Sequence, residues 1–266
     1  MITMGKRLSF PTRSFGSDAV LPDLALLTAW VAERRGREGD LISFLLERAL
    51  RPQLDAGISL PCAGGSFYSD RWRQAINGIE DGVVTGELEC RAEDVARDAE
   101  DLIRVRRGLF VAIPGPHLLG LQDRYYQDRG EAGEALFSVY RSLMREQRDA
   151  GVDGHVLFCE RVHRPELEAL ARRKVFFFPK SMTRKSLSLL LEYQQTIAVW
   201  PSGLSLLSGL IDDYEVHRVV LLNPDAQDFR QALQLMDPDQ IFCGGYCRES
   251  CDEYWTSLVK SAELLI

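Results

Sequence analysis

This sequence is dominated by short, continuously apolar runs. Between them lie longer stretches in which the apolar residues recur at the spacing of a helix. The clearest runs are FVAI, VLFC, VFFF, TIAVW and VVLL. A strand that is apolar on both faces is typical of a parallel sheet covered on both sides, because a strand with one face in water alternates apolar and polar residues. We therefore expect eight parallel strands, at residues 9–15, 58–61, 109–113, 155–159, 174–178, 196–200, 218–222 and 240–243.

Amphipathic helical stretches lie between these strands. The stretch 135–150 is the clearest, with apolar side chains on one side and arginines on the other, and similar stretches precede the later strands. Strands that alternate with helices over 266 residues match a (β/α)8 TIM barrel, whose typical length is about 250 residues. We predict a single barrel domain over residues 1–266. An open doubly wound sheet is the alternative, but the sequence has no glycine-rich dinucleotide fingerprint.

The interval between the second and third predicted strands is unusually long. It contains VVTGELEC, which indicates a small hairpin, and AEDVARDAEDLIRVRR, which has the pattern of a helix with a basic end. We expect residues 67–107 to form an elaborated βα loop. Such loops lie over the carboxyl ends of barrel strands, where they contribute to substrate sites.

Composition and charge exclude several classes of protein. The chain carries 32 Lys and Arg against 39 Asp and Glu, a formal net charge of −7, which disfavours binding to nucleic acid. The sequence has no run of about 18 apolar residues and no signal-peptide pattern at its start. We therefore expect a cytoplasmic protein that does not enter a membrane. Its six cysteines are then more naturally thiols or metal ligands than disulfides.

Four of the cysteines follow predicted strands, at the end where a barrel builds its active site: Cys62, Cys159, Cys243 and Cys247. One interpretation is a thiolate-rich zinc site with Cys159, Cys243 and Cys247 as ligands. The other is that these thiols pack as small apolar side chains, since free cysteine is among the most buried residue types. The spacing in CGGYCRESC differs from the usual zinc knuckle, so the sequence leaves both open.

Other polar residues also follow predicted strands. Glu160 comes directly after the fourth strand and is placed to bind an amine or transfer a proton, although an ion pair with a neighbouring arginine is the alternative. Asp70, His117 and Asn223 follow the second, third and seventh strands, and we expect them at the same opening as substrate-binding residues. The sequence contains no Ser-His-Asp order, Walker loop or HExxH helix.

Three segments carry a resemblance to a known family. PTRSFGS at 11–17 is similar to a PTxxxGS opening, QLDAGISLPCAGG precedes an Asp, and IPGPHLL leads through a helix into EQRDAGVDGHVLFCER. Together they resemble the barrel of cobalamin-independent methionine synthase, in the superfamily that includes uroporphyrinogen decarboxylase and corrinoid or coenzyme M methyltransferases. The resemblance implies a barrel fold and substrate contacts at Ser17, Gly115 and His117.

Most zinc ligands of that family are not matched. Its Asp-Glu-Pro segment falls on Cys159 and Glu160, its His-x-Cys zinc pair on residues 176–178, and its zinc-binding Glu on Trp200 or a neighbour. Only Cys247 has the position of a family ligand. The aromatic replacements imply an apolar cavity suited to a flat ligand, with Trp200 among the binding residues, and core packing is the alternative.

Two functions remain open from the sequence. The first is a methyltransferase-like barrel enzyme that acts on a thiol or corrinoid-linked methyl group, with Cys159 and Glu160 catalytic and Cys159, Cys243 and Cys247 binding zinc or substrate sulfur. The second is a barrel that has lost the zinc-dependent reaction and binds a corrinoid, a tetrapyrrole or a related cofactor. With either function we expect the protein to bind a small molecule. A corrinoid protein or a second copy of the chain is the expected partner.

Overall fold

Two parallel sheets form the centre of the molecule in the computed structural model, which describes residues 7–18, 20–34, 39–248 and 251–265. The first sheet has the order β10-β11-β12-β2, with β2 (Thr12–Ser17), β10 (Thr196–Val199), β11 (Arg218–Leu222) and β12 (Ile241–Cys247). The second has the order β3-β6-β8-β9, with β3 (Cys62–Gly64), β6 (Phe110–Pro114), β8 (Gly154–Cys159) and β9 (Val175–Pro179). Each predicted strand thus has a counterpart within a few residues.

The prediction of a closed (β/α)8 barrel is wrong. A single bridge between Arg13 and Leu60 links the two sheets on one side, but β9 and β10 are not paired in the described part of the chain. The side-chain amide of Gln194 occupies the free edge of β9. It accepts a hydrogen bond from the backbone N–H of Phe177 (2.9 Å) and donates one to the carbonyl oxygen of that residue (3.3 Å). These are the backbone groups that a neighbouring strand would bind, so the arrangement stays open.

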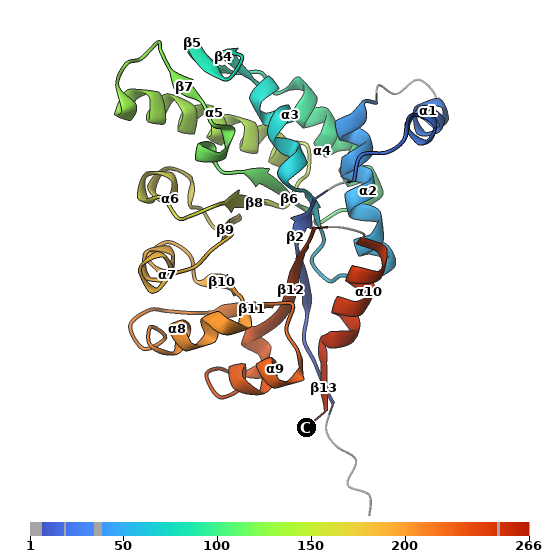
Figure 1. The fold of residues 1–266 in the computed structure, drawn as a ribbon, viewed down its shortest axis with the longest axis vertical. Helices are drawn as coiled ribbons and strands as arrows, with labels where there is room; N and C mark the ends of the chain where they lie inside the picture. The colour runs from blue at the N-terminus through green and yellow to red at the C-terminus, as the bar shows by residue number, and fades with distance from the viewer. Residues whose placement is uncertain (1–6, 19, 35–38, 249–250, 266) are drawn as a thin grey trace, which may run out of the picture.

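Helices cover the outer side of the strands (Figure 1). They are α2 (Leu41–Asp55), α5 (Arg129–Asp149), α6 (Arg164–Leu170), α7 (Arg184–Leu191), α8 (Leu204–Ser208), α9 (Ala226–Ala232) and α10 (Cys251–Ser261), with α1 (Leu24–Glu33) beside α2. The predicted helix at 135–150 corresponds to the second part of α5, which ends at Asp149 and begins where the Asp128 side chain accepts hydrogen bonds from two backbone N–H groups. No helix of the described residues is both long and apolar enough to span a bilayer.

The predicted insertion between the second and third strands contains the expected hairpin and helix. It consists of η1 (Ser66–Tyr68), α3 (Ser69–Gln74), β4 (Ile76–Glu80), β5 (Val83–Cys90) and α4 (Glu93–Val105). The hairpin turns at Asp81 and Gly82, which have positive φ angles of 49° and 79°, as an Asp-Gly turn requires. The short elements that remain are β1 (Arg7–Ser9), η2 (Pro116–Leu119), β7 (Gln122–Asp123), η3 (Pro201–Gly203), η4 (Pro238–Gln240) and β13 (Glu263–Leu265).

The strands separate two apolar cores. The outer core fills the space between the strands and the helices. The inner core lies where the two sheets face each other, and it is rich in aromatic rings. Phe15 of β2 and Phe178 of β9 stack there with ring centroids 4.4 Å apart. Because alternate residues of a strand point to opposite faces, a shift of one position decides which core a side chain enters.

Candidate functional site

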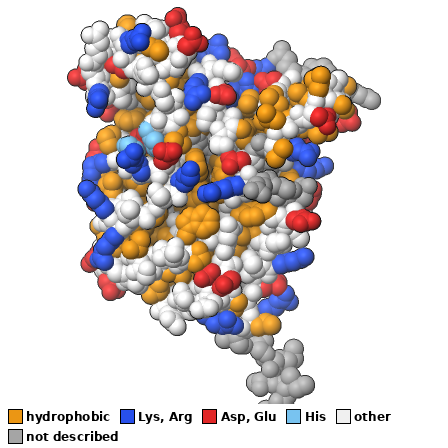
Figure 2. All heavy atoms as spheres, in the orientation of Figure 1, with side chains coloured by type: hydrophobic (Ala, Val, Ile, Leu, Met, Phe, Trp, Pro, Cys, Tyr) orange, Lys and Arg blue, Asp and Glu red, His pale blue; other side chains and the backbone are white. Residues whose placement is uncertain are grey.

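The carboxyl ends of the strands bring aromatic and polar side chains together, at the edge where parallel α/β proteins usually bind ligands. Phe158 and Tyr246 stack across the two sheets with centroids 5.4 Å apart, and Phe178 lies 6.2 Å from the Tyr246 ring. Trp200 packs against the same inner core. Figure 2 shows hydrophobic side chains in the middle of the face on which the histidines beside α6 lie, with charged side chains around them. We call Phe158, Phe178, Trp200 and Tyr246 the aromatic wall.

A carboxylate is fixed beside the aromatic wall. The hydroxyl of Tyr246 donates a hydrogen bond to Oδ1 of Asp18 (2.6 Å), and the hydroxyl of Ser66 donates to the same oxygen. Burial and the neighbouring carboxylate raise the pKa of Tyr246, so this hydroxyl keeps its proton and remains a donor. In the described part of the chain Asp18 forms no ion pair with any cation. Its charge is therefore free to pair with a ligand.

A histidine and a glutamate join the loops after β6 and β8. Nδ1 of His117 lies 2.9 Å from Oε1 of Glu166, and the backbone N–H of His117 donates to the same carboxylate. Nε2 of His117 accepts a hydrogen bond from the backbone N–H of Glu160 at 3.3 Å. His163 lies against the His117 ring at 4.5 Å, and burial lowers its pKa. Since both ring nitrogens of His117 are engaged within the protein, this group holds the two loops in place.

The three cysteines predicted as metal ligands lie on the outer side of the strands. Cys159, Cys243 and Cys247 each follow directly an aromatic residue that belongs to the inner core, so strand alternation directs them toward the helices. Burial raises the pKa of Cys159, and it raises that of Cys243 to about 12, so both are neutral thiols near pH 7. Cys247 forms a disulfide with Cys251. The expectation that all cysteines are thiols or metal ligands is therefore wrong for this pair.

The other predicted site residues have different surroundings. The Ser17 hydroxyl is buried at the end of β2 and has no hydrogen-bond partner among the residues that the structure describes, and Gly115 donates its N–H to the Phe158 carbonyl oxygen at 2.7 Å. Asn223 follows β11 with a positive φ of 49° and accepts a hydrogen bond from the hydroxyl of Tyr254. Asp70 lies on α3, where it pairs with Arg73 of the same helix. The prediction that Asp70 is a binding residue is not tested by this contact.

The residues at the carboxyl ends do not fit a zinc ion held as in methionine synthase. In β9 the positions that the resemblance assigns to a His-x-Cys pair hold Phe176 and Phe178, and Trp200 follows β10. No three His, Cys, Asp or Glu side chains of the described residues are grouped so that they could hold a metal. Phenylalanine and tryptophan side chains carry no atom that coordinates zinc. Whether a corrinoid binds stays a prediction.

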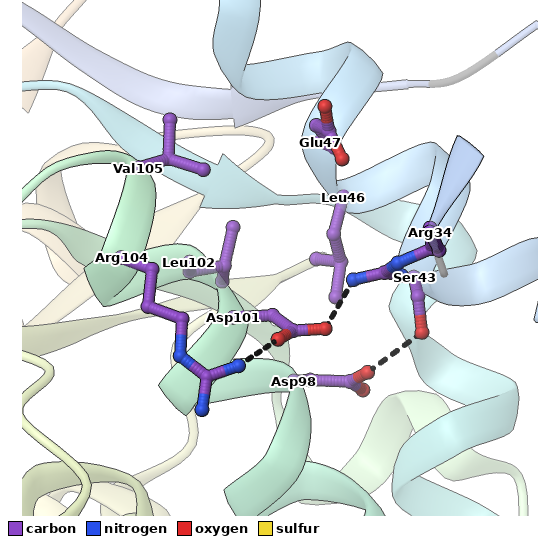
Figure 3. A pocket seen from close by; sticks show the side chains of 9 residues that line it. All are labelled: Arg34, Ser43, Leu46, Glu47, Asp98, Asp101, Leu102, Arg104 and Val105. Carbon is purple, nitrogen blue, oxygen red and sulfur yellow. Dashed lines mark hydrogen bonds and ion pairs between the residues drawn. The ribbon is translucent and has the colours of Figure 1, made fainter. Parts of the chain in front are cut away.

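A cavity of about 330 Å³ lies between α2 and α4, and two arginines that line it pair with the same aspartate (Figure 3). Arg34 and Arg104 both pair with Asp101, and the Ser43 hydroxyl donates to Asp98 at 3.2 Å. These contacts tie α4 to α2 and to the end of α1. The charges of Arg34 and Arg104 are therefore balanced within the protein.

Sequence reasoning did not identify Asp18, Ser66 or Tyr246 as site residues. Asp18 directly follows the PTRSFGS motif, and Tyr246 lies two residues after Gly244 on the inner face of β12. The motif and the alternation along β12 are the signals that could have found them. Ser66 gave no such signal, since its contact depends on how the loop after β3 folds back.

Comparisons with known proteins relate the fold to methionine synthases. No protein-family model matches the chain, and no curated protein sequence matches it. The structure is similar to a B12-independent methionine synthase from Shewanella sp. W3-18-1 solved in complex with selenomethionine, with a TM-score of 0.66, 15% sequence identity and 96% of each chain covered. It is also similar to a putative vitamin-B12 independent methionine synthase from Listeria monocytogenes, with a TM-score of 0.54, 13% identity, and 92% of this chain and 95% of that chain covered.

At these identities the likeness defines the class of fold alone. The chain has a methionine synthase-like fold, which confirms the fold relationship that the sequence motifs implied. A particular family, substrate or reaction does not follow from it.

Proposed function

We propose that this chain binds a small amino acid with an apolar, thioether-like side chain at the carboxyl ends of its strands, and that it does so without the zinc site of methionine synthases. The observation that carries the proposal is the Asp18 carboxylate, held by the Tyr246 and Ser66 hydroxyls and left without a cation. A ligand ammonium group would pair with Asp18. A thioether would pack against the aromatic wall, since sulfur makes favourable contacts with aromatic rings.

The relative from Shewanella supports this choice of ligand, because its structure is a complex with selenomethionine. The zinc-dependent transfer of a methyl group through Cys159, Cys243 and Cys247 has less support. Activation of a thiol requires a thiolate, but burial raises the pKa of Cys159 and Cys243 and keeps both thiols protonated, and Cys247 is bonded to Cys251 in a disulfide. The methyl-transfer reaction, a corrinoid protein partner and self-association stay predictions from the sequence.

Calorimetric titration with L-methionine tests the proposal. N-acetyl-L-methionine is the control ligand, because it keeps the thioether and loses the ammonium charge. We expect Asp18→Asn to weaken the binding of L-methionine by about tenfold or more, since a hydrogen bond to a charged group contributes about 1.5–3 kcal/mol. Asp70→Asn is the matched control, because Asp70 is an exposed carboxylate on α3 that pairs with Arg73.

Two results would reject the proposal. One is wild-type protein that binds L-methionine no better than N-acetyl-L-methionine. The other is Asp18→Asn protein with unchanged affinity and an unchanged circular dichroism spectrum. If instead Asp70→Asn abolishes binding and Asp18→Asn does not, the prediction of Asp70 as the binding carboxylate is the correct one.

A further inference from the structure

Arg13 places an unpaired cation at the opposite ends of the strands. Its side chain extends from β2 between the two sheets and is largely buried. The guanidinium carbon lies 4.5 Å from the ring centroid of Phe176, 5.0 Å from that of Phe110 and 5.3 Å from that of Phe15. Over the residues that the structure describes, no carboxylate and no hydrogen-bond acceptor pairs with this guanidinium.

The charge on Arg13 persists at neutral pH. Burial lowers its pKa to about 10, which leaves the group protonated. The neighbouring Cys62 supplies no negative charge, because burial raises the pKa of its thiol to about 12. The aromatic rings offset part of the cost of burial through cation–π contacts, but they accept none of the five N–H groups in a hydrogen bond. Since buried charges in proteins are normally paired, a partner for Arg13 is missing.

A cavity of about 1220 Å³ lies beside Arg13, at the amino ends of the strands. Phe110, Thr196 and Arg218 are the first residues of β6, β10 and β11, and all three line it. Gln194, which separates β9 from β10, lines it as well. The unpaired edge between these two strands therefore adjoins a space that is large enough for a small organic molecule.

In the described chain, neither Arg13 nor Arg218 is paired with an acidic side chain of this cavity. Arg218 is exposed, and its guanidinium carbon lies 5.5 Å from the ring centroid of Phe242. In the described chain Arg218 has no ion pair, and its proximity is one cause of the lowered pKa of Arg13. The cavity also has acidic side chains on its lining, but none of them pairs with either arginine: Glu192, Asp213, Glu215 and Asp239. Glu192 pairs with Arg164 instead, and Glu215 binds His217 and Gln195.

The geometry points to a binding site for a small organic carboxylate in this cavity, with Arg13 as its principal partner. The planar carboxylate matches the planar fork of N–H donors on a guanidinium, and Arg218 adds a second positive charge. An aromatic or other flat body would pack in the cavity beside Phe110 and Phe176, which both line it. The site lies at the opposite ends of the strands from Asp18, so it is independent of the proposed amino-acid site.

Titration of the full chain with benzoate tests this site, with benzamide as a neutral ligand of nearly the same shape. We expect benzoate to raise the melting temperature of the wild-type protein in a saturable way and benzamide not to do so. Arg13→Gln is expected to weaken benzoate binding by about tenfold or more, because it removes a charge-assisted pair. Arg218→Gln, at an exposed position that should not affect folding, is expected to weaken it about threefold.

Arg230→Gln is the matched control, since Arg230 lies on α9 and its guanidinium binds a carbonyl oxygen of its own helix. Its affinity for benzoate should equal that of the wild-type protein. The site is refuted if wild-type protein shows no saturable response to benzoate, if benzamide binds as well, or if Arg13→Gln binds benzoate unchanged. Should Arg13→Gln fail to fold, unchanged affinity in Arg218→Gln refutes the site in its place.

Discussion

His155 is expected to make the stability of this protein fall as the pH falls below 6.5. The imidazole is fully buried, its Nε2 lies 3.1 Å from Oε1 of Gln147, and its Nδ1 has no hydrogen-bond partner within the described part of the chain. Burial, with a smaller contribution from Arg148, lowers its pKa from 6.5 to about 3. The neutral form is therefore the one that the fold accommodates.

The sign and the size of the effect follow from these two pKa values. Between pH 6.5 and pH 3 the unfolded chain binds a proton at His155 and the folded chain does not, so acid favours the unfolded state. The contribution is fully present above pH 6.5. At pH 5 the loss amounts to about 2 kcal/mol, and the slope for one histidine does not exceed about 1.4 kcal/mol per pH unit.

Urea denaturation at pH 7.5 and pH 5 measures this difference. His155→Leu should be less stable at pH 7.5, because Gln147 loses its partner, but its stability should fall by about 2 kcal/mol less between the two pH values than that of the wild-type protein. Equal pH dependence in His155→Leu and wild-type protein would refute the reasoning.

Three other features of the packing can be tested separately. A thiol reagent applied without reductant should modify the exposed Cys90 and leave Cys243 unmodified until the protein unfolds. Peptide mass spectrometry measures the labelling rate of each cysteine, and equal rates would contradict the burial of Cys243. Asp98→Ala should lower the free energy of unfolding in urea by about 1.5–3 kcal/mol, because the buried Arg71 guanidinium loses its buried carboxylate partner and keeps only the more exposed Asp40 and Asp94, and a loss below about 1 kcal/mol would contradict the role of that pair. Gly64→Ala should lower the free energy of unfolding by at least about 2 kcal/mol, since the added Cβ would lie 2.5 Å from a backbone oxygen of β6. Gly57 has a similar φ and open space around it, so Gly57→Ala should lower the free energy of unfolding by about 1 kcal/mol.

The positions of the strands could be predicted from the sequence, but the closure of the sheet could not. Runs such as VFFF are apolar on both faces, and that property alone fixes a buried strand. Closure depends on whether β9 and β10 pair. The amide of Gln194 prevents this by binding the backbone of Phe177, seventeen positions earlier in the chain. No periodicity in the sequence marks such a contact.

Because these strands are apolar on both faces, the sequence could not show which way the cysteine side chains point, and their direction was predicted wrongly. A strand that alternates polar and apolar residues reveals which positions face the core, but VLFC and IFCGGYC have no such alternation. The structure places Phe158 and Tyr246 inward, so Cys159 and Cys247 point outward toward the helices. The family motif nevertheless ends one residue before Asp18, the carboxylate of the proposed site.

The affinity of the chain for zinc tests most directly whether the carboxyl ends of the strands hold aromatic side chains in place of a metal site. The chain, stripped of metal and kept reduced so that Cys247 is a free thiol, would be titrated with zinc against a chromogenic chelator. We expect no site tighter than about micromolar, since a structural zinc site with three or four protein ligands contributes roughly 10–16 kcal/mol of binding free energy. One zinc ion per chain, held at nanomolar affinity and lost in Cys243→Ser, would contradict the structure of the site described above.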